Sequence, residues 1–207
     1  DSTGAGGVIE EGGIQWMTSG KGILHKEYHE KNFSKKGGEM QMVQLWVNLP
    51  AKDKMTEPKY QNIENKDLAK VDLGNGIGSI DIIAGEFEKN KGPASSFTPM
   101  SLFNVKLNKG KGTSLSFNEN HNTGLLIIKG NVIINNKERA PTNHFVLFEN
   151  KGKEFTIKAE DDAEILVLSG EPIDEPIASY GPFVMNTNDE IKQTIDDFNS
   201  GKFGYLD

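Results

Sequence analysis

Short apolar runs alternate with polar, glycine-containing stretches along most of this chain. The runs are rich in Val, Ile, Leu and Phe. Runs of strand length bounded by turn-forming residues are typical of β-strands, and their regular spacing is typical of a sandwich or barrel. We therefore predict an all-β fold with strands at Met42–Leu49, Ile80–Ile83, Ser101–Leu107, Gly124–Ile128, Asn131–Ile134, His144–Phe148, Glu154–Ile157 and Glu164–Leu168.

Two tight turns are predicted between neighbouring runs. Lys129-Gly130 separates two apolar runs and favours a β-hairpin. Asn135-Asn136 favours a second turn, because asparagine tolerates a positive φ angle. Both turns indicate that the strands between residues 124 and 148 follow one another closely.

One helix is expected near the C-terminal end. Thr187 can cap it, and Glu190 three residues later completes a capping box. Gly201 supplies a stop signal. A weaker helical pattern covers Ile63–Leu68. The apolar stripe of the terminal helix, spaced at i, i+4 and i+7, consists of Ile191, Ile195 and Phe198.

A boundary between two modules is expected close to residue 75. The segment Asp72–Gly78 is dense in glycine and follows a polar connector. Residues 1–75 contain too few strand candidates to close a barrel, whereas residues 76–207 contain enough for a complete β-module plus the terminal helix. We predict an incomplete first module and a complete second one.

The composition is that of an ordinary globular protein. The 207 residues carry a formal net charge of −7, with 35% hydrophobic and 26% charged residues and no cysteine. The lack of cysteine excludes disulfides, zinc-thiolate sites and thiol nucleophiles, and it fits a reducing, cytoplasmic location. The acidic balance argues against direct nucleic-acid binding. No apolar run approaches the roughly 20 residues that span a bilayer, so we expect no membrane partner.

The segment Gly22–His29 carries the sharpest chemical pattern. If it forms a strand, His25, Glu27 and His29 share one face. Two imidazoles and a carboxylate suit non-haem iron with open coordination positions. The alternative is a polar surface strand without a metal.

The remaining histidines and the two tryptophans have simpler interpretations. His121 and His144 have no carboxylate at short spacing in their strands, so we expect hydrogen-bonding or structural roles. Trp16 and Trp46 lie in strand-like stretches and are most simply core or pocket-wall aromatics.

Three long, well-separated motifs stand out from this pattern. They are Gly13–Thr18 with Gly22–Glu27, then Gln44–Pro50 with Lys54-Met55 and Glu57–Gln61, and finally Gly170–Ile173 with Gly181–Thr187. Together they resemble the pirin family, and the resemblance covers nearly the whole chain. It implies a bicupin: two tandem cupin modules, each a double-stranded β-helix or jelly roll, with a metal, usually iron, in the N-terminal one.

The resemblance also implies a ligand set. The family uses two ligands from a His-Pro-His motif and two from a Gly-x-x-His-x-Glu motif. His25 and Glu27 match the second pair, and the first pair has no match. Glu27 is then both metal ligand and candidate base for a flavonol hydroxyl. Trp16, Met17 and Trp46 are the candidate pocket walls.

Taken together, these features predict a pirin-like metal-binding cupin of the quercetin 2,3-dioxygenase type. The chain opens on Asp1–Gly4, which resembles the middle of an N-terminal cupin, so we expect about 70 upstream residues and two of four metal ligands to be missing. We predict an inactive fragment, a small aromatic substrate such as a flavonol, and no metal in the second module. The alternative is a non-catalytic regulatory module with a protein partner.

Overall fold

The computed structural model describes residues 1–206, which form two compact units. Unit 1 comprises Asp1–Asn65 together with the chain from Ile173 onward, and unit 2 comprises Lys66–Pro172. The assignment of residues 1–75 and 76–207 to two cupin modules stays a prediction. The two compact units divide the chain at other positions, after Asn65 and after Pro172. The expected boundary falls in the turn between β3 (Ala69–Asp72) and β4 (Gly78–Ala84), whose pairing keeps both strands in unit 2.

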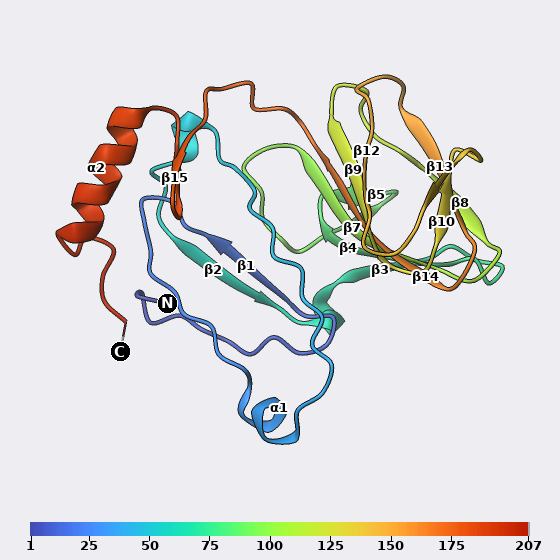
Figure 1. Cartoon of the computed structure of the whole chain (residues 1–207), viewed down its shortest axis with the longest axis horizontal. Coiled ribbons are helices and arrows are strands. Elements are labelled where there is room, and N and C mark those ends of the chain that lie inside the picture. The colour runs from blue at the N-terminus through green and yellow to red at the C-terminus, as the bar shows by residue number, and fades with distance from the viewer. Residues whose placement is uncertain (207) are drawn as a thin grey trace. The chain divides into compact units, whose positions relative to one another are not determined.

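Unit 2 is a sandwich of two antiparallel sheets (Figure 1). The larger sheet has the strand order β12-β9-β14-β7-β4-β3, and the smaller sheet has the order β11-β10-β13-β8. This is the all-β cupin architecture that the sequence predicts. The remaining strand bounds are β5 Glu86–Phe87, β6 Asn90–Lys91, β7 Met100–Leu107, β8 Gly112–Ser116, β9 Asn122–Lys129, β10 Val132–Ile134, β11 Glu138–Ala140, β12 Phe145–Leu147, β13 Glu154–Ala159 and β14 Ala163–Gly170.

The core of unit 2 lies between its two sheets. Phe103 and Val105 on β7 and Ile165 and Val167 on β14 are fully buried, at every second position of their strands. Burying a side chain of this size contributes about 1.5–3 kcal/mol. The strands expected between residues 80 and 168 are confirmed, because each of those segments forms a strand in one of the two sheets.

The two expected turns have different outcomes. Asn135 and Asn136 have φ angles of 52° and 54° and connect β10 to β11, which confirms the turn. The hairpin expected at Lys129-Gly130 is wrong, because β9 belongs to the larger sheet and β10 to the smaller one. Gly130 has a φ of 76° and lies against the backbone of Asp162, so the turn carries the chain from one sheet to the other.

Unit 1 contains less regular structure. Its elements are β1 Ile14–Thr18, α1 Lys31–Lys36, the 3-10 turn η1 Ala51–Asp53, β2 Lys59–Ile63, β15 Ala178–Tyr180, β16 Phe183–Met185 and α2 Asn188–Asn199. A second 3-10 turn, η2 Asn65–Asp67, begins at the last residue of the segment Asp1–Asn65 and continues into unit 2. β1 pairs with β2, and β15 pairs with β16. The helix expected at Ile63–Leu68 is wrong, because Ile63 pairs with Ile14 in the β1–β2 ladder and only a single 3-10 turn follows.

The terminal helix α2 confirms its sequence signals. Thr187 is the N-cap, and Glu190 completes a capping box. The helix contacts β15 and β16 within unit 1 (Figure 1). Phe198 lies 6.0 Å from Phe183 and 6.1 Å from Phe203, measured between ring centroids, so these three rings form a small aromatic cluster. No helix in residues 1–206 is long and apolar enough to cross a membrane.

The strand expected at Met42–Leu49 is wrong. Residues 37–50 contain neither helix nor strand, and Trp46 is 67% exposed. The apolar pattern of this segment favours a strand, but a strand also needs a hydrogen-bonded neighbour. None of the described strands pairs with these residues.

Candidate functional site

His25 and Glu27 lie together on an irregular loop of unit 1. Residues 22–30 form no strand, so the expected face of alternating side chains does not exist there. The imidazole Nδ1 of His25 nevertheless lies 3.8 Å from Oε1 of Glu27. Both side chains face solvent, with exposed fractions of 36% and 46%. The loop therefore brings one imidazole and one carboxylate within reach of a common cation.

Local contacts hold the start of this loop. The backbone N–H of Ser2 donates to the carbonyl of Leu24 at 2.7 Å, and the Ser2 hydroxyl oxygen accepts from the N–H of Leu24 at 3.1 Å. Gly22 has a φ of 117°, and a Cβ there would overlap the ring of Phe203. Only glycine fits this position, which explains the first residue of the Gly-x-x-His-x-Glu motif.

The far end of the loop is fixed by Glu30. Its carboxylate accepts from the backbone N–H groups of Asn32 at 2.7 Å and Phe33 at 2.9 Å, and so caps α1. These hydrogen bonds, that from Asn32 first, lower the pKa of Glu30 below its usual value. Glu30 is therefore engaged with the helix and is not directed toward the His25–Glu27 pair.

The third expected ligand is directed elsewhere. The ring of His29 lies edge-on to Phe33, with 5.7 Å between centroids. Within residues 1–206, no group of three or more His, Asp or Glu side chains is close enough to hold a metal ion. Catalytic metal sites generally use at least three protein ligands. The described residues therefore bring one imidazole and one carboxylate together and place no third such side chain beside them.

The grouping of Trp16, Met17 and Trp46 as pocket walls stays a prediction. Trp16 and Met17 are half-buried neighbours on β1, and neighbouring strand residues point to opposite faces. Trp46 lies in the irregular segment 37–50. At most one of Trp16 and Met17 therefore faces any given cavity.

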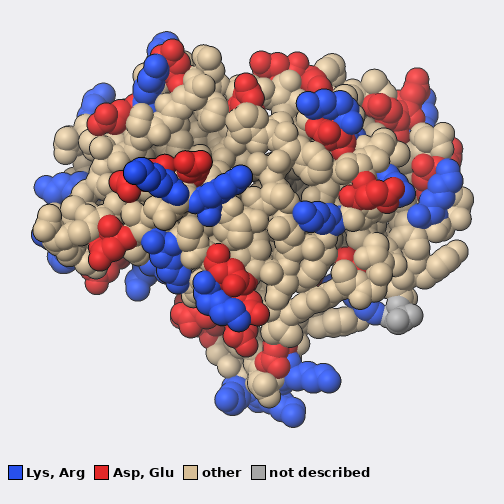
Figure 2. Space-filling view, turned by 180° about the vertical axis from the view of Figure 1, so that it is seen from behind, with Lys and Arg blue, Asp and Glu red and all other residues tan. Residues whose placement is uncertain are grey.

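The charged surface shows both signs. On the face in Figure 2, Lys and Arg side chains are interspersed with Asp and Glu. Ion pairs form between such side chains, as between Lys21 and Glu57 and between Arg139 and Glu160. Paired exposed charges contribute little to stability, because solvent screens them.

The two histidines of unit 2 make hydrogen bonds. His121 Nδ1 lies 3.3 Å from Oγ of Ser169, and His144 Nδ1 lies 3.2 Å from the carbonyl of Thr142. Both contacts agree with the hydrogen-bonding roles that we expect from the sequence.

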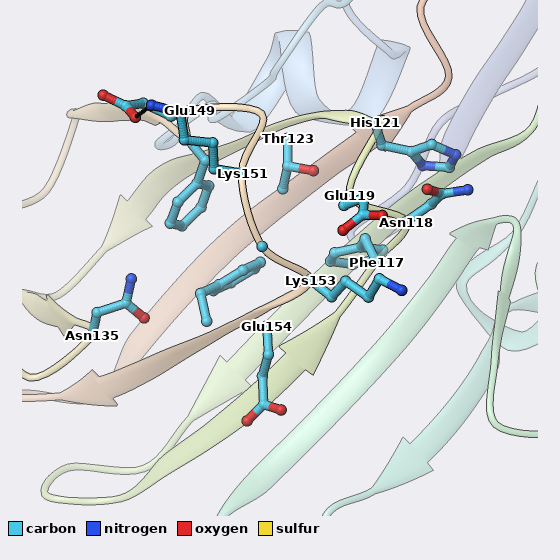
Figure 3. Close-up of a pocket in the computed structure, with 13 residues that line it drawn as sticks. Phe117, Asn118, Glu119, His121, Thr123, Asn135, Glu149, Lys151, Lys153 and Glu154 are labelled. Carbon is cyan, nitrogen blue, oxygen red and sulfur yellow. Dashed lines mark hydrogen bonds and ion pairs between the residues drawn. The ribbon is translucent and has the colours of Figure 1, made fainter.

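A cavity that the sequence did not predict lies at one end of the unit 2 sandwich, between β8, β9 and β13 (Figure 3). Its volume is about 80 Å³. Its walls include Phe117, Phe148 and Phe155, and Thr123 and His121 also line it. The available signal was three phenylalanines close to strand ends, but single positions do not reveal which strand ends meet.

Comparison with known proteins decides the family. A family model described as "Pirin" matches residues 1–47, and one described as "Pirin C-terminal cupin domain" matches residues 102–204. "Putative quercetin 2,3-dioxygenase PA2418" of Pseudomonas aeruginosa is 42% identical over 203 residues, which cover 98% of this chain and 71% of that protein. The chain belongs to the pirin family.

Other pirin relatives extend this result. A pirin-like protein of Caulobacter vibrioides is 37% identical over 98% of this chain and 72% of its own length. The crystal structure of quercetin 2,3-dioxygenase from Acinetobacter baumannii is similar to this pirin with a TM-score of 0.96 and 45% identity, over 100% of this chain and 72% of that one. The resemblance to the pirin family that the three motifs indicated is therefore confirmed.

Proposed function

We propose that this pirin is a quercetin 2,3-dioxygenase-type oxidoreductase in which His25 and Glu27 are half of a divalent metal site. The observation that carries the proposal is the 3.8 Å approach of the imidazole to the carboxylate in the Gly-x-x-His-x-Glu motif. Family membership and relatives named as quercetin 2,3-dioxygenases support it. Iron is the metal and a flavonol the substrate class that we expect.

Glu27 has a second role in this proposal. An ionised carboxylate accepts protons, and a flavonol presents an acidic hydroxyl. The Glu27 side chain is 46% exposed, so a planar substrate reaches it without displacement of other groups. His25 lies beside the carboxylate on one side. Glu27 is thus the group that we expect to take the hydroxyl proton.

We further propose that the chain by itself does not turn over a flavonol. Two ligands leave a cation largely coordinated by water, so the cation exchanges rapidly. Binding of substrate and cation at the pair is then weak.

The test is an anaerobic titration of the full chain with Fe²⁺ or with Co²⁺ as a spectroscopic probe. We expect weak binding that falls by about tenfold or more in His25→Ala and Glu27→Gln, because each removes one of two ligands. His144→Ala is the matched control, since the His144 ring lies in unit 2 and makes a hydrogen bond to the carbonyl of Thr142, and it should bind as the wild type does. Equal binding by all four proteins contradicts the half-site.

Turnover is measured separately with quercetin and Fe²⁺. We expect neither oxygen uptake nor loss of the flavonol absorbance for this chain. Sustained oxygen uptake that requires Glu27 overturns the inactivity of the chain but supports the role of the carboxylate. Oxygen uptake that persists in Glu27→Gln contradicts the role of Glu27.

A second candidate function is that of a protein-interaction module. The apolar segment Met40–Val47 favours it, because Met42, Trp46 and their neighbours are exposed. A pull-down from the native host with the wild type and a Trp46→Ser variant separates the two functions. Failure to recover any partner, together with measurable turnover, counts against the interaction module.

A further inference from the structure

The cavity in unit 2 opens at the end of an aromatic ladder that runs through the sandwich. Successive ring centroids lie 5.9, 5.8, 6.1 and 4.4 Å apart. In order along the ladder, the rings belong to Phe87, Phe103, Phe117, Phe155 and Phe148. The inner ring of Phe103 is fully buried, whereas Phe117 and Phe148 are only half-buried. The apolar core is therefore open to the cavity at this end.

The charged residues around the cavity form its rim. Figure 3 shows Glu149 and Lys151 turned toward each other, while Glu154 extends away from the ring of Phe117. Lys151 Nζ donates to Glu149 Oε2 at 3.1 Å, so these two charges are already paired. The rim carries more negative than positive groups: the three carboxylates of Glu119, Glu149 and Glu154, and the two ammonium groups of Lys151 and Lys153. An anion therefore gains no net attraction, and an apolar or neutral molecule is favoured.

Thr123 provides the polar group of the cavity. It is only 8% exposed, and its Oγ1 lies 2.9 Å from Oγ of Ser169, which is 4% exposed. Ser169 in turn lies 3.3 Å from Nδ1 of His121. Thr123, Ser169 and His121 thus form a hydrogen-bond chain with Ser169 in the middle. Both ends line the cavity, and of the two Thr123 is buried whereas His121 is half-buried.

The hydrogen-bond capacity of this chain depends on the tautomer of His121. If Nδ1 of His121 carries no proton, the Ser169 hydroxyl donates to it and the Thr123 hydroxyl donates to Ser169. The Thr123 oxygen can then accept a hydrogen bond from a ligand. If Nδ1 carries a proton, it donates to Ser169, and the Ser169 hydroxyl donates to Thr123. The Thr123 hydroxyl can then donate to a ligand. A ligand hydroxyl satisfies either state, because it both donates and accepts.

We propose that this cavity binds a small, neutral aromatic alcohol, with the ring against Phe117, Phe148 and Phe155 and the hydroxyl at Thr123. Its volume of about 80 Å³ is smaller than that of the roughly 150 Å³ enclosed cavity that accommodates benzene, so it takes one ring whose far edge stays at the open mouth. The site lies in unit 2 and is independent of the metal chemistry proposed for His25 and Glu27.

The experiment titrates the full chain with phenol, toluene and benzoate and follows the ligands by NMR saturation transfer. We expect saturable binding of phenol with a dissociation constant on the order of millimolar, as for other very small ligands. Benzoate should bind at least about tenfold more weakly, because its charge must be desolvated beside the rim carboxylates. Phenol that never saturates, or benzoate that binds as well as phenol, overturns the proposal.

Variants locate the bound molecule. Thr123→Val keeps the shape of the side chain. It should weaken the binding of phenol by about 5- to 10-fold, the effect of one hydrogen bond, and leave the binding of toluene unchanged. Phe148→Ala should weaken both ligands. The matched control is Phe145→Ala, which removes an exposed ring from the neighbouring strand β12 and should change neither.

The isosteric Thr123→Val variant keeps the test decisive if Phe148→Ala does not fold. If Thr123→Val weakens the binding of phenol and of toluene equally, the hydroxyl contact at Thr123 is overturned. If Phe145→Ala and Phe148→Ala lower the affinity for the ligands equally, the ligands bind elsewhere and the site is overturned.

Discussion

Lys54, which lies in one of the pirin motifs, is a buried charged residue of unit 1. Lys54 is 6% exposed, and its ammonium donates to Oδ1 of Asn48 at 2.8 Å. Burial lowers the pKa of Lys54, and the nearby carboxylates of Glu175 and Glu190 partly oppose this effect. Glu175 also accepts from the backbone N–H of Ala51 at 2.6 Å. Lys54 therefore connects the segment 48–54 to the C-terminal part of unit 1.

We expect Lys54→Met to destabilise unit 1 by about 1–3 kcal/mol at neutral pH, because Asn48 loses its donor and two carboxylates lose a nearby cation. The measurement is urea unfolding. Lys52→Met, an exposed neighbour, is the control and should lie within about 0.5 kcal/mol of the wild type.

The pH dependence of Lys54 has a definite sign. Its pKa is lowered in the folded state, so between that value and the ordinary lysine value of 10.5 the unfolded chain binds more protons. Stability conferred by the wild-type lysine therefore rises with pH through this window. The difference in unfolding free energy between wild type and Lys54→Met should widen as pH approaches 10.5. A difference that narrows over the same range contradicts the burial of a charged Lys54.

At the scale of elements, α2 and the strands of unit 2 follow rules that are local in sequence. The capping box needs only Thr187 and Glu190, three residues apart, and it forms as expected. The strands of unit 2 need only alternating apolar positions and a neighbour that the same pattern supplies. By contrast, residues 42–49 have the strand pattern and no described neighbour, and Gly130 turns the chain between sheets. Pairing partners are set by the whole topology, so the sequence pattern alone did not identify them.

The candidate site shows the same division. The motif identified His25 and Glu27 as neighbours in space, but their surroundings depend on Ser2 and Phe203, at opposite ends of the chain. The cavity at Thr123 depends on Ser169, which is 46 residues away in sequence. Contacts over such separations arise from sheet register, which no short motif encodes.

The cap of α2 provides a prediction at this scale. Glu190 accepts from the Thr187 hydroxyl at 3.0 Å and from the backbone N–H groups of Thr187 and Asn186 at 2.8 and 3.0 Å. These hydrogen bonds, that from the Thr187 hydroxyl first, lower the pKa of Glu190. Its stabilising effect is therefore present above the ordinary value of 4.5 and is lost as pH falls through the lowered pKa.

We expect Glu190→Ala to lower the unfolding temperature at pH 7 and to match the wild type under strongly acidic conditions. Asp196→Ala, which removes an exposed carboxylate outside the first turn, is the control and should not show this convergence. Thr187→Ala should cost about 1 kcal/mol. Circular dichroism melts at several pH values measure all three, and a pH-independent effect of Glu190→Ala contradicts the charged cap.

For the whole molecule, the distribution of buried side chains separates the two units. The main hydrophobic cluster consists entirely of unit 2 residues, from Ile80 to Val167. Unit 1 buries few large apolar side chains, among them Ile63, Ile191 and Phe203. Local stability follows apolar burial and backbone hydrogen bonding, so the units differ in their resistance to opening.

Amide hydrogen exchange should reveal this difference. We expect β7, β9 and β14 to exchange slowest and residues 22–30 and 37–50 to exchange rapidly, because the latter lack helix or strand hydrogen bonds. Mass spectrometry of peptic fragments resolves these segments. Protection of residues 37–50 equal to that of β14 contradicts the irregular structure of this segment, and β1 and β2 should show intermediate values.

The order of the segments along the chain also bears on synthesis. The polypeptide leaves unit 1 after Asn65, builds the whole of unit 2, and rejoins unit 1 at Ile173. A ribosome adds roughly 5–20 residues per second, so the N-terminal part of unit 1 waits for many seconds before its C-terminal complement emerges. Throughout that interval Gly22 has no Phe203 to cover it and Lys54 has no Glu175 beside it. The β-sandwich is thus the portion of this pirin able to mature first on the nascent chain, while unit 1 assembles only after the segment that begins at Ile173 has emerged.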